Sequence, residues 1–450
     1  MKQTHPVISI IVILTYLILA GCGGDFTNHT GNSAVPASSS ENSSGSSWEN
    51  RTGTNENSSP IRIAMATDLH YQPEVSDAAS SLIPQMKYIS QLTDCLLDEA
   101  TAWKPDILLL CGDLTNNGHR NEHEALIEKL KAAREQGLRI YVLPGNHDLK
   151  GISHEEFSVL YRDYGYDSPF MQDDNSLSYV LKITDQFWLL MLDTNLSGAG
   201  GGIGDETLTW VERVLTEARN AGADVITASH HNLLGHSSSQ YNKQYSFENR
   251  EGLLALFEKY QIPLNISGHL HKQHVAADTS HKQPFYEITG GMLADYPNLY
   301  SQFTITPDSG RISYQAAPLN VDDWARRTGY QNRTLLNFSA YSRACRQKNA
   351  EALVGGMLST MDITGDDLSA LTKFWTGISL EVSDGAIRDF RQQHLSSDEY
   401  RLWQQYRNGS RYSEWLDFLL NQKGAVDSHS LLIEYEPSEG ITANNSQSAS

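Results

Sequence analysis

The chain has 450 residues, of which 39% are hydrophobic and 20% charged; this length suggests more than one domain, and this composition excludes a wholly disordered protein. Asp and Glu outnumber Lys and Arg by 54 to 34, so the formal net charge is -20. Because an acidic chain repels phosphate backbones, a nucleic-acid polymer is not an expected partner, and an anionic substrate would need a local positive charge such as a bound metal ion.

The first segment of the chain has the features of an export signal. Lys2 precedes an apolar run, Val7–Ala20, which is shorter than the roughly 20 residues of a membrane-spanning helix and is typical of a signal peptide. The run ends in Leu19-Ala20-Gly21-Cys22, which resembles the lipobox of bacterial lipoproteins. We therefore expect residues 1–21 to be a cleaved signal peptide and Cys22 to be acylated, with a short membrane anchor as the alternative.

Residues 22–59 are rich in Ser, Asn, Gly and Thr and contain few large apolar side chains. Such a segment cannot bury enough apolar surface to fold, so it is expected to be a flexible tether. Several acyl chains on one cysteine suffice for stable attachment to a membrane. The sequence thus predicts a protein of the bacterial cell envelope that is anchored to a membrane through Cys22 and faces outside the cytoplasm.

From Ile61 onward, short apolar runs alternate with helical stretches. The expected strands are residues 61–67, 107–111, 138–143, 178–183, 187–192, 224–228, 263–266, 275–278, 285–288, 300–306 and 311–315. The expected helices are residues 82–103 and 122–136, and a glycine-rich loop, 198–204, leads into a further helix that ends near residue 220. Strands that alternate with helices and are then followed by strands in succession predict a layered α/β sandwich over residues 60–322.

The pattern changes near Asp322, where strand signals become rare. Helical periodicity covers residues 324–347, 366–376, 384–393 and 397–421. The aromatic side chains at helical spacing in this region include Trp375, Trp403, Trp415 and Phe418. This spacing is typical of the packed interior of a small helical domain. We expect an all-helical domain over residues 323–435 and a polar tail over residues 436–450.

Five short polar segments stand out because each follows a predicted strand. They are Asp68-Leu69-His70, Gly112-Asp113, Gly145-Asn146-His147-Asp148, His230-His231 and Gly268-His269-Leu270-His271. In α/β sheets, loops converge and sites form at the carboxyl ends of the strands. Imidazole and carboxylate groups gathered at one such edge predict a metal site.

In this order, the segments D-x-H, G-D, G-N-H-D, H and G-H-x-H resemble the calcineurin-like metallophosphoesterase superfamily over roughly residues 61–316. Three pieces inside this range, GDLTNNG at 112–118, SHHNLLGHS at 229–237 and TGGML at 289–293, are similar to bacterial class III cyclic nucleotide phosphodiesterases. Those enzymes include lipoproteins with an additional C-terminal helical domain. The resemblance implies a four-layer α/β/β/α sandwich of the metallophosphoesterase type, followed by a small all-helical domain.

The resemblance also implies two metal ions in each subunit. Carried over position by position, it gives the first ion Asp68, His70, Asp113 and His271, and the second ion Asp113, Asn146, His230 and His269. Carboxylate, imidazole and amide ligands suit Fe, Mn or Zn, and one carboxylate can share its two oxygens between two cations. A hydroxide that bridges the two ions would then attack the phosphorus of a small phosphoester.

The resemblance also implies which residues contact the substrate and which take part in proton transfer. The implied substrate contacts are His70, Asn146, His147 and His271. His147 would protonate or stabilise the leaving oxygen, and Asp148 would hold His147 in the useful tautomer, with a helix N-cap as the alternative for Asp148.

The sequence leaves two neighbouring positions to decide. Alternate residues of a strand point to opposite faces, so only one of His230 and His231 should bind metal, and the family position selects His230. His236 and Asn232 either line the substrate cavity or belong to a solvated loop.

The leading hypothesis for function is a metal-dependent phosphodiesterase that hydrolyses a cyclic nucleotide. One alternative is a phosphomonoesterase or an envelope phosphodiesterase that acts on lipid or glycan phosphate. Another is a non-catalytic lipoprotein of the envelope that binds a ligand in the same cavity. The complete set of ligands together with His147 argues against a dead site, because loss of one metal ligand would be its simplest mark.

Overall fold

The computed structural model describes residues 59–75, 83–196, 201–237, 247–407, 411–421 and 427–438. The expected signal peptide, Cys22 and all but the end of the expected tether lie outside these residues, as do residues 439–450 of the expected tail. Within the described ranges, no helix combines the length and the apolar composition that crossing a membrane requires.

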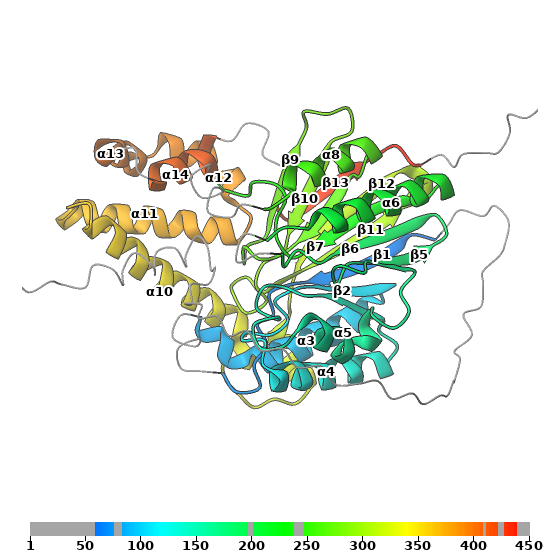
Figure 1. The fold of residues 1–450 in the computed structure, drawn as a ribbon. Helices are drawn as coiled ribbons and strands as arrows, with labels where there is room; N and C mark the ends of the chain where they lie inside the picture. Colours follow the sequence, from blue (N-terminus) through cyan, green and yellow to red (C-terminus); the bar gives the residue numbers. More distant parts are fainter. Residues whose placement is uncertain are drawn as a thin grey trace, which may run out of the picture.

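Two mixed β-sheets form the centre of the N-terminal body (Figure 1). The first sheet has the order β13 (Ser430–Glu434), β12 (Arg311–Pro318), β11 (Leu299–Thr306), β1 (Ile61–Ala66), β2 (Ile107–Cys111) and β3 (Ile140–Leu143). The second has the order β4 (Met171–Gln172), β5 (Tyr179–Thr184), β6 (Phe187–Leu192), β7 (Asp224–Ser229), β8 (Leu264–Ser267), β10 (Phe285–Thr289) and β9 (His274–Asp278). β1, β2 and β3 run parallel, and so do β6, β7, β8 and β10. Their carboxyl ends therefore meet along common edges.

Helices cover the outer faces of both sheets. They are α3 (Ile89–Trp103), α4 (Arg120–Glu135), α5 (His154–Leu160), α6 (Asp205–Ala221) and α8 (Arg250–Tyr260), with short 3-10 turns η1 (Pro84–Tyr88), η2 (Arg162–Tyr164) and η4 (Pro307–Ser309). β6 shows the layering, because Leu189 and Met191 pack in the apolar cluster shared with the first sheet, whereas Trp188 and Leu190 pack with residues of α6 and α8. A strand that is covered on both faces has to be apolar throughout, as β6 is. The predicted α/β/β/α sandwich is confirmed.

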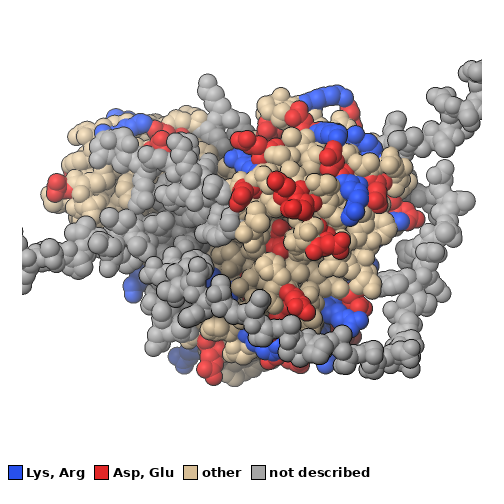
Figure 2. All heavy atoms as spheres, viewed as in Figure 1, with Lys and Arg blue, Asp and Glu red and all other residues tan. Residues whose placement is uncertain are grey.

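On the face that Figure 2 shows, the acidic side chains are spread over the surface. Acidic and basic side chains are interspersed there over α6 and α8. The net charge of -20 is therefore not gathered into one field on this face.

The helical region lies beside one end of the sandwich (Figure 1). It consists of α9 (Val321–Arg327), η5 (Leu335–Asn337), α10 (Phe338–Ser359), α11 (Gly365–Ser383), α12 (Ile387–Ser396), α13 (Asp398–Tyr406) and α14 (Arg411–Asn421). Its core is aromatic: the Trp375 ring meets the Trp403 ring edge-on at 5.0 Å between centroids and stacks on the Trp415 ring at 5.7 Å. The helical domain and its aromatic interior are confirmed.

The structure differs from the expected boundary between residues 322 and 323. Val321, Trp324 and Phe338 belong to the apolar core of the sandwich, and Trp324 Nε1 donates a hydrogen bond to Asp98 Oδ2 at 2.8 Å. The N-terminal body thus extends through α9 into the first turn of α10.

The expected all-helical stretch 323–435 also contains a strand. β13 pairs antiparallel with β12 at the edge of the first sheet, with Ile433 opposite Ile312. Both isoleucines are fully buried. Because a five-residue strand after a helical region gives too short an alternation to stand out, the sequence pattern missed this return of the chain to the sandwich.

Candidate metal centre

The polar segments that follow the strands come together at the carboxyl edges of both sheets. Asp68 and His70 follow β1, Asp113 follows β2, Asn146 and His147 follow β3, His230 follows β7, and His269 and His271 follow β8. Asp68, Asp113 and His230 are fully or almost fully buried. The convergence expected from the positions of these residues after parallel strands is confirmed.

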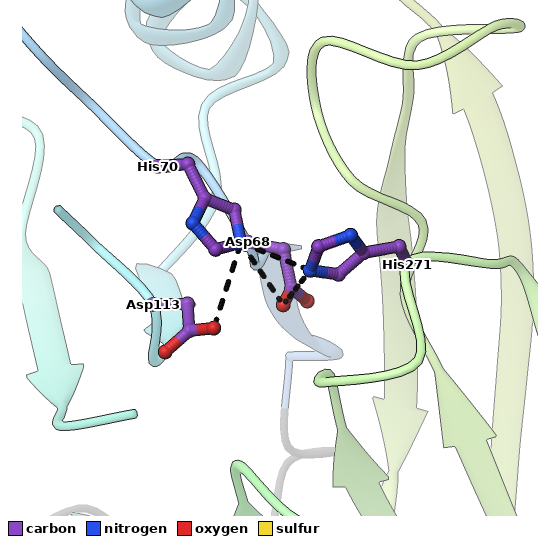
Figure 3. A group of neighbouring side chains, drawn as sticks. All are labelled: Asp68, His70, Asp113 and His271. Carbon is purple, nitrogen blue, oxygen red and sulfur yellow. Dashed lines mark hydrogen bonds and ion pairs between the residues drawn. The ribbon is translucent and has the colours of Figure 1, made fainter. Parts of the chain in front are cut away.

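One cluster consists of Asp68, His70, Asp113 and His271, whose ligand atoms all lie within 4.8 Å of one another. Figure 3 shows their side chains pointing toward a common centre. His70 Nε2 lies 2.9 Å from His271 Nε2 and 3.5 Å from Asp113 Oδ2. His271 Nε2 lies 3.2 Å from Asp68 Oδ1. Two carboxylates and two imidazoles are therefore close enough to surround one cation.

A second cluster lies on the other side of Asp113. Asn146 Oδ1 is 3.2 Å from His230 Nε2 and 3.1 Å from His269 Nδ1. His230 Nε2 is 3.4 Å from Asp113 Oδ1. The two oxygens of Asp113 are thus divided, because Oδ2 faces His70 in the first cluster and Oδ1 faces His230 in the second.

The backbone at this edge is held in an unusual conformation. Positive φ angles occur at Asp68 (51°), His70 (46°), Asp113 (48°), His269 (71°) and His271 (55°). Residues other than glycine are strained in this region and keep it only where the surroundings hold them, as happens at functional sites. Hydrogen bonds between the loops supply part of that hold, including Asp68 N to Gly112 O at 3.1 Å and His269 N to Asp68 Oδ2 at 3.0 Å.

Position 112 has to be a glycine because His230, a candidate metal ligand that follows a strand of the second sheet, approaches it closely. Its φ is 83°, and a Cβ at this position would lie 2.6 Å from His230 Nδ1. Since His230 Nδ1 also lies 2.9 Å from the Cys111 carbonyl oxygen, the His230 ring rests directly on the backbone that leads to Asp113. A side chain at position 112 would push His230 away from the centre.

The ionisation of these groups favours cation binding. Burial alone would raise the pKa of Asp113, but the surrounding imidazoles, with His230 foremost, hold it well below its usual range. Burial lowers the pKa of His269 to about 3, with help from His230, and keeps the pKa of His70 well below its usual value. Ionised carboxylates beside neutral His70 and His269 offer free lone pairs, which is the state that a metal ion needs in its ligands. His230 differs, because the effect of burial is outweighed by Asp113 and Asp68, which raise its pKa to about 9, so a metal ion that binds there has to displace a proton. The donor set present here fits divalent cations of the Mn, Fe or Zn type.

His147 lies beside both clusters. Its ring meets the His70 ring edge-on at 4.5 Å between centroids, and its Nε2 is 3.9 Å from Asp113 Oδ2. Its Nδ1 is 2.5 Å from the Asn116 carbonyl oxygen. Because a carbonyl oxygen can only accept, Nδ1 carries the proton in this contact, and Nε2 is the nitrogen that faces the centre.

The prediction that Asp148 holds the His147 ring is wrong, because Asp148 binds other groups. Both Asp148 oxygens accept hydrogen bonds, from Leu114 N at 3.1 Å, Thr115 N at 2.8 Å and Thr115 Oγ1 at 2.9 Å in the loop after β2, and from Gly145 N at 2.8 Å in its own loop. The alternative, a helix N-cap, is also wrong, because the next helix is α5 and Ser153 caps it. Asp148 instead joins the loop after β2 to the loop after β3. The Asn116 carbonyl, which the motifs did not identify as a partner, orients His147.

The structure separates His231 from His230 as expected. His231 Nδ1 lies 2.8 Å from Thr194 Oγ1, and its ring packs on the His269 ring at 4.5 Å between centroids. His231 thus packs against the His269 ring and helps to hold it in place. His230 is the one whose Nε2 reaches Asp113.

His236 does not belong to a solvated loop, because it is fully buried. Its Nε2 lies 3.1 Å from Glu287 Oε2, and its Nδ1 lies 3.0 Å from His274 Nδ1. Glu287 also accepts from Leu233 N at 2.9 Å and from Asn265 Nδ2 at 2.8 Å. Glu287 was missed by the sequence reasoning, although a carboxylate in the middle of the apolar β10 is itself a signal of a buried polar contact.

Comparisons with known proteins agree with this geometry. Residues 61–273 match the model of the calcineurin-like phosphoesterase family, and residues 320–424 match the C-terminal domain of cyclic nucleotide phosphodiesterase. A probable glycerophosphodiester phosphodiesterase of Arcobacter nitrofigilis is 28% identical over 171 residues, which cover 38% of this chain and 58% of that protein. This match therefore spans less than two thirds of the relative.

Two further similarities are more extensive in length. A probable cyclic nucleotide phosphodiesterase of Moraxella catarrhalis is 24% identical over 262 residues, which cover 57% of this chain and 85% of that protein. The crystal structure of a dimetal phosphatase from Danio rerio gives a TM-score of 0.46 at 15% identity and covers 57% of this chain and 96% of that one. Since both family models match in chain order, one on the sandwich that carries the buried Asp/His cluster and one on the helices, the chain is a calcineurin-like metallophosphoesterase with the C-terminal domain of cyclic nucleotide phosphodiesterases.

Proposed function

We propose that the protein hydrolyses a small phosphodiester, a cyclic nucleotide, at a pair of metal ions. The observation that carries this proposal is the division of Asp113, whose Oδ2 is 3.5 Å from His70 Nε2 and whose Oδ1 is 3.4 Å from His230 Nε2. A carboxylate placed in this way can bridge two cations about 3.5–4 Å apart, the spacing of two-metal phosphoesterase sites. Asp68, His70, Asp113 and His271 would hold one ion, and Asp113, Asn146, His230 and His269 would hold the other.

The protein's own residues would position the substrate and handle the proton of the leaving group. Two ions of the Fe, Mn or Zn type, when bound, would neutralise charge on the phosphoryl oxygens and supply a nucleophilic water. His70, Asn146, His147 and His271 would contact the phosphate. His147 Nδ1 is fixed by the Asn116 carbonyl at 2.5 Å, so Nε2 is the atom that can hold a proton and deliver it to the leaving oxygen.

The choice of a cyclic nucleotide rests on two similarities. Residues 320–424 match the C-terminal domain of cyclic nucleotide phosphodiesterase, and the Moraxella catarrhalis relative is a probable enzyme of that kind. A glycerophosphodiester is the second candidate, because the Arcobacter nitrofigilis relative is a probable glycerophosphodiester phosphodiesterase with 28% identity. Both substrates are phosphodiesters with an alkoxide leaving group, so both use the proposed proton donor.

A substrate panel with the metal-loaded full chain tests the proposal. We expect kcat/KM for 3′,5′-cyclic nucleotides to exceed that for glycerophosphocholine and for p-nitrophenyl phosphate by roughly tenfold or more. A preference for the monoester would make the protein a phosphomonoesterase, and a preference for glycerophosphodiesters or for lipid or glycan phosphates would make it an envelope phosphodiesterase of another kind. Metal binding with no hydrolysis of any substrate would support a ligand-binding lipoprotein instead.

We also propose that acylated Cys22 attaches the protein to a membrane of the cell envelope. The support comes from the sequence, in which the lipobox-like Leu19-Ala20-Gly21-Cys22 follows the apolar run Val7–Ala20 directly. Expression in a bacterial host should yield protein that partitions into detergent and carries acyl chains on Cys22 by mass spectrometry. The Cys22→Ala variant should keep its apolar segment uncleaved and should lack the mass of the acyl chains. A variant that still carries the acyl mass would contradict the proposal.

A further inference from the structure

A residue of the metal centre packs inside the helical domain. Leu270 lies between His269 and His271, and the residue is only 8% exposed. It belongs to an apolar cluster whose other buried members all come from residues 354–420 in helices α10 to α14 and their connections. The loop after β8 therefore places two candidate metal ligands in the sandwich and inserts the side chain between them into the core of the neighbouring domain.

The two residues that flank Leu270 are strained. His269 has a φ of 71° and His271 a φ of 55°. Residues with side chains adopt this left-handed conformation only where the surrounding structure holds them. Leu270 N also donates a hydrogen bond to the Gly268 carbonyl oxygen at 2.8 Å, which tightens the turn. A buried anchor between two strained ligands is well placed to supply the hold that their conformation needs.

A second contact, made by the first residue of β9, joins the chain just after this loop to the helical domain. The His274 ring lies 6.3 Å from the Phe418 ring between centroids. Leu270 is thus part of an interface rather than an isolated contact.

The loop after β10 is tied to the helices by polar contacts. Arg346 of α10 lies 3.5 Å from Asp295 with its Nη1 and donates to Ser379 Oγ and Ser383 Oγ of α11 at 3.3 and 3.1 Å. In the same loop Met292 pairs with Thr67, which directly precedes Asp68. The helices therefore contact two loops near the metal centre, the loop of Leu270 directly and the loop of Asp295 through Arg346. In Figure 1 they lie beside one end of the sandwich.

From these contacts we infer that Leu270 is a positioning residue, through which the helical domain holds His269 and His271 in the geometry that binds metal. The C-terminal domain is then part of what sets the metal affinity of the protein. This inference rests on the metal site of the proposed function and goes beyond it, because it concerns a residue that touches neither metal nor substrate.

Matched cavity variants of the full chain test the inference. Leu270→Ala and Leu371→Ala each remove a leucine from the same apolar cluster, in which Leu371 is fully buried, but only Leu270 belongs to the loop of the metal centre. The affinity for Mn²⁺ is measured by competition with a chromophoric chelator, alongside kcat and KM. We expect Leu270→Ala to bind Mn²⁺ roughly tenfold or more weakly, as for other residues that orient metal ligands, and Leu371→Ala to stay within about twofold of the wild type.

Two further variants separate positioning from loss of fold. Leu270→Met conserves volume and should restore wild-type affinity, and Leu270→Val should give an intermediate loss that is measurable even where the alanine variant does not fold. Near-UV circular dichroism of the stacked Trp375 and Trp415 monitors the helical core. Equal affinity losses in Leu270→Ala and Leu371→Ala, or unchanged affinity in Leu270→Ala and Leu270→Val, would overturn the inference while leaving the proposed function intact. A wild-type protein that binds no Mn²⁺, Zn²⁺ or Fe²⁺ would overturn both.

Discussion

The metal centre at the edge of the sandwich and the core of the helical domain both consist of buried side chains, but different interactions hold them together. At the sandwich edge, Asp68, Asp113 and His230 are buried charged or titratable groups, and the backbone around them is strained. In the described part of the helical domain, Trp375, Trp403 and Trp415 pack against one another, and the buried polar residues of α11 and α14 are Ser and Thr, which carry no charge. Strain and buried charge lower stability unless a function requires them, so this contrast places the chemistry at the sandwich edge and leaves packing to the helices.

The largest expected effect comes from a substitution at the residue that both clusters share. Asp113→Asn keeps the size of the side chain but removes its charge, so hydrolysis of bis(p-nitrophenyl) phosphate should fall by roughly 10³-fold or more. The metal content of the protein, measured by elemental mass spectrometry, should fall together with the activity. Asp173→Asn is the matched control, because Asp173 is an equally buried carboxylate that binds Ser176 and Thr207 instead. Retained activity in the Asp113 variant would contradict the two-metal arrangement.

The next effect separates proton transfer from metal binding. His147→Ala should lower kcat by about 10²-fold for a substrate with an alkoxide leaving group, the range expected for general acid catalysis. The loss should be smaller for p-nitrophenolate, which leaves without a proton. Both ions should remain bound in this variant, and His154→Ala, at a half-exposed position, should change neither quantity. Loss of metal from the His147 variant would make His147 a ligand.

A third change tests the corrected position of Asp148. Asp148→Ala leaves the buried N–H groups of Leu114, Thr115 and Gly145 without their acceptor, so the free energy of unfolding should fall by about 2–3 kcal/mol. Asp148→Asn should rescue only part of this loss, because its amide group presents donors to donors. Denaturant unfolding measures both variants. A normal stability combined with a strong loss of kcat would instead favour the earlier interpretation, in which Asp148 acts through His147.

The smallest effects concern the strand that returns from the helices to the sandwich. Ile433→Val removes one methyl group from the buried pairing with Ile312, which should cost about 1 kcal/mol of unfolding free energy. Glu434→Ala breaks the ion pair with Arg311, whose side chains are both more than half exposed, and should cost about 0.5 kcal/mol or less. A larger loss in the glutamate variant would mean that charge rather than apolar burial attaches β13.

The sequence predicted the site better than its supports. Asp68, Asp113 and His230 could be assigned to one centre because each follows a strand, and the ends of parallel strands meet at one edge. Most partners of Asp148 could not be assigned, since three of its four donors belong to Leu114 and Thr115, which lie more than 30 positions away. Short motifs show which side chains carry chemistry, but not which backbone groups surround them.

The connection between the two regions was also hidden from the sequence. Leu270 is one ordinary leucine between two histidines, and nothing in its neighbourhood indicates that its packing partners begin at residue 354. The strand β13 and the core residues Val321 and Trp324 likewise depend on contacts between distant segments. The order of helices and strands follows from local periodicity, whereas domain boundaries follow from tertiary packing.

The division of Asp113 between two clusters is tested most directly by loading the wild-type chain with Mn²⁺ and recording its stoichiometry together with its electron paramagnetic resonance spectrum. We expect two ions per chain and the multiline signal of an exchange-coupled pair, because one carboxylate would bridge them. A single ion per chain, or two ions with the separate six-line signals of isolated Mn²⁺, would contradict it.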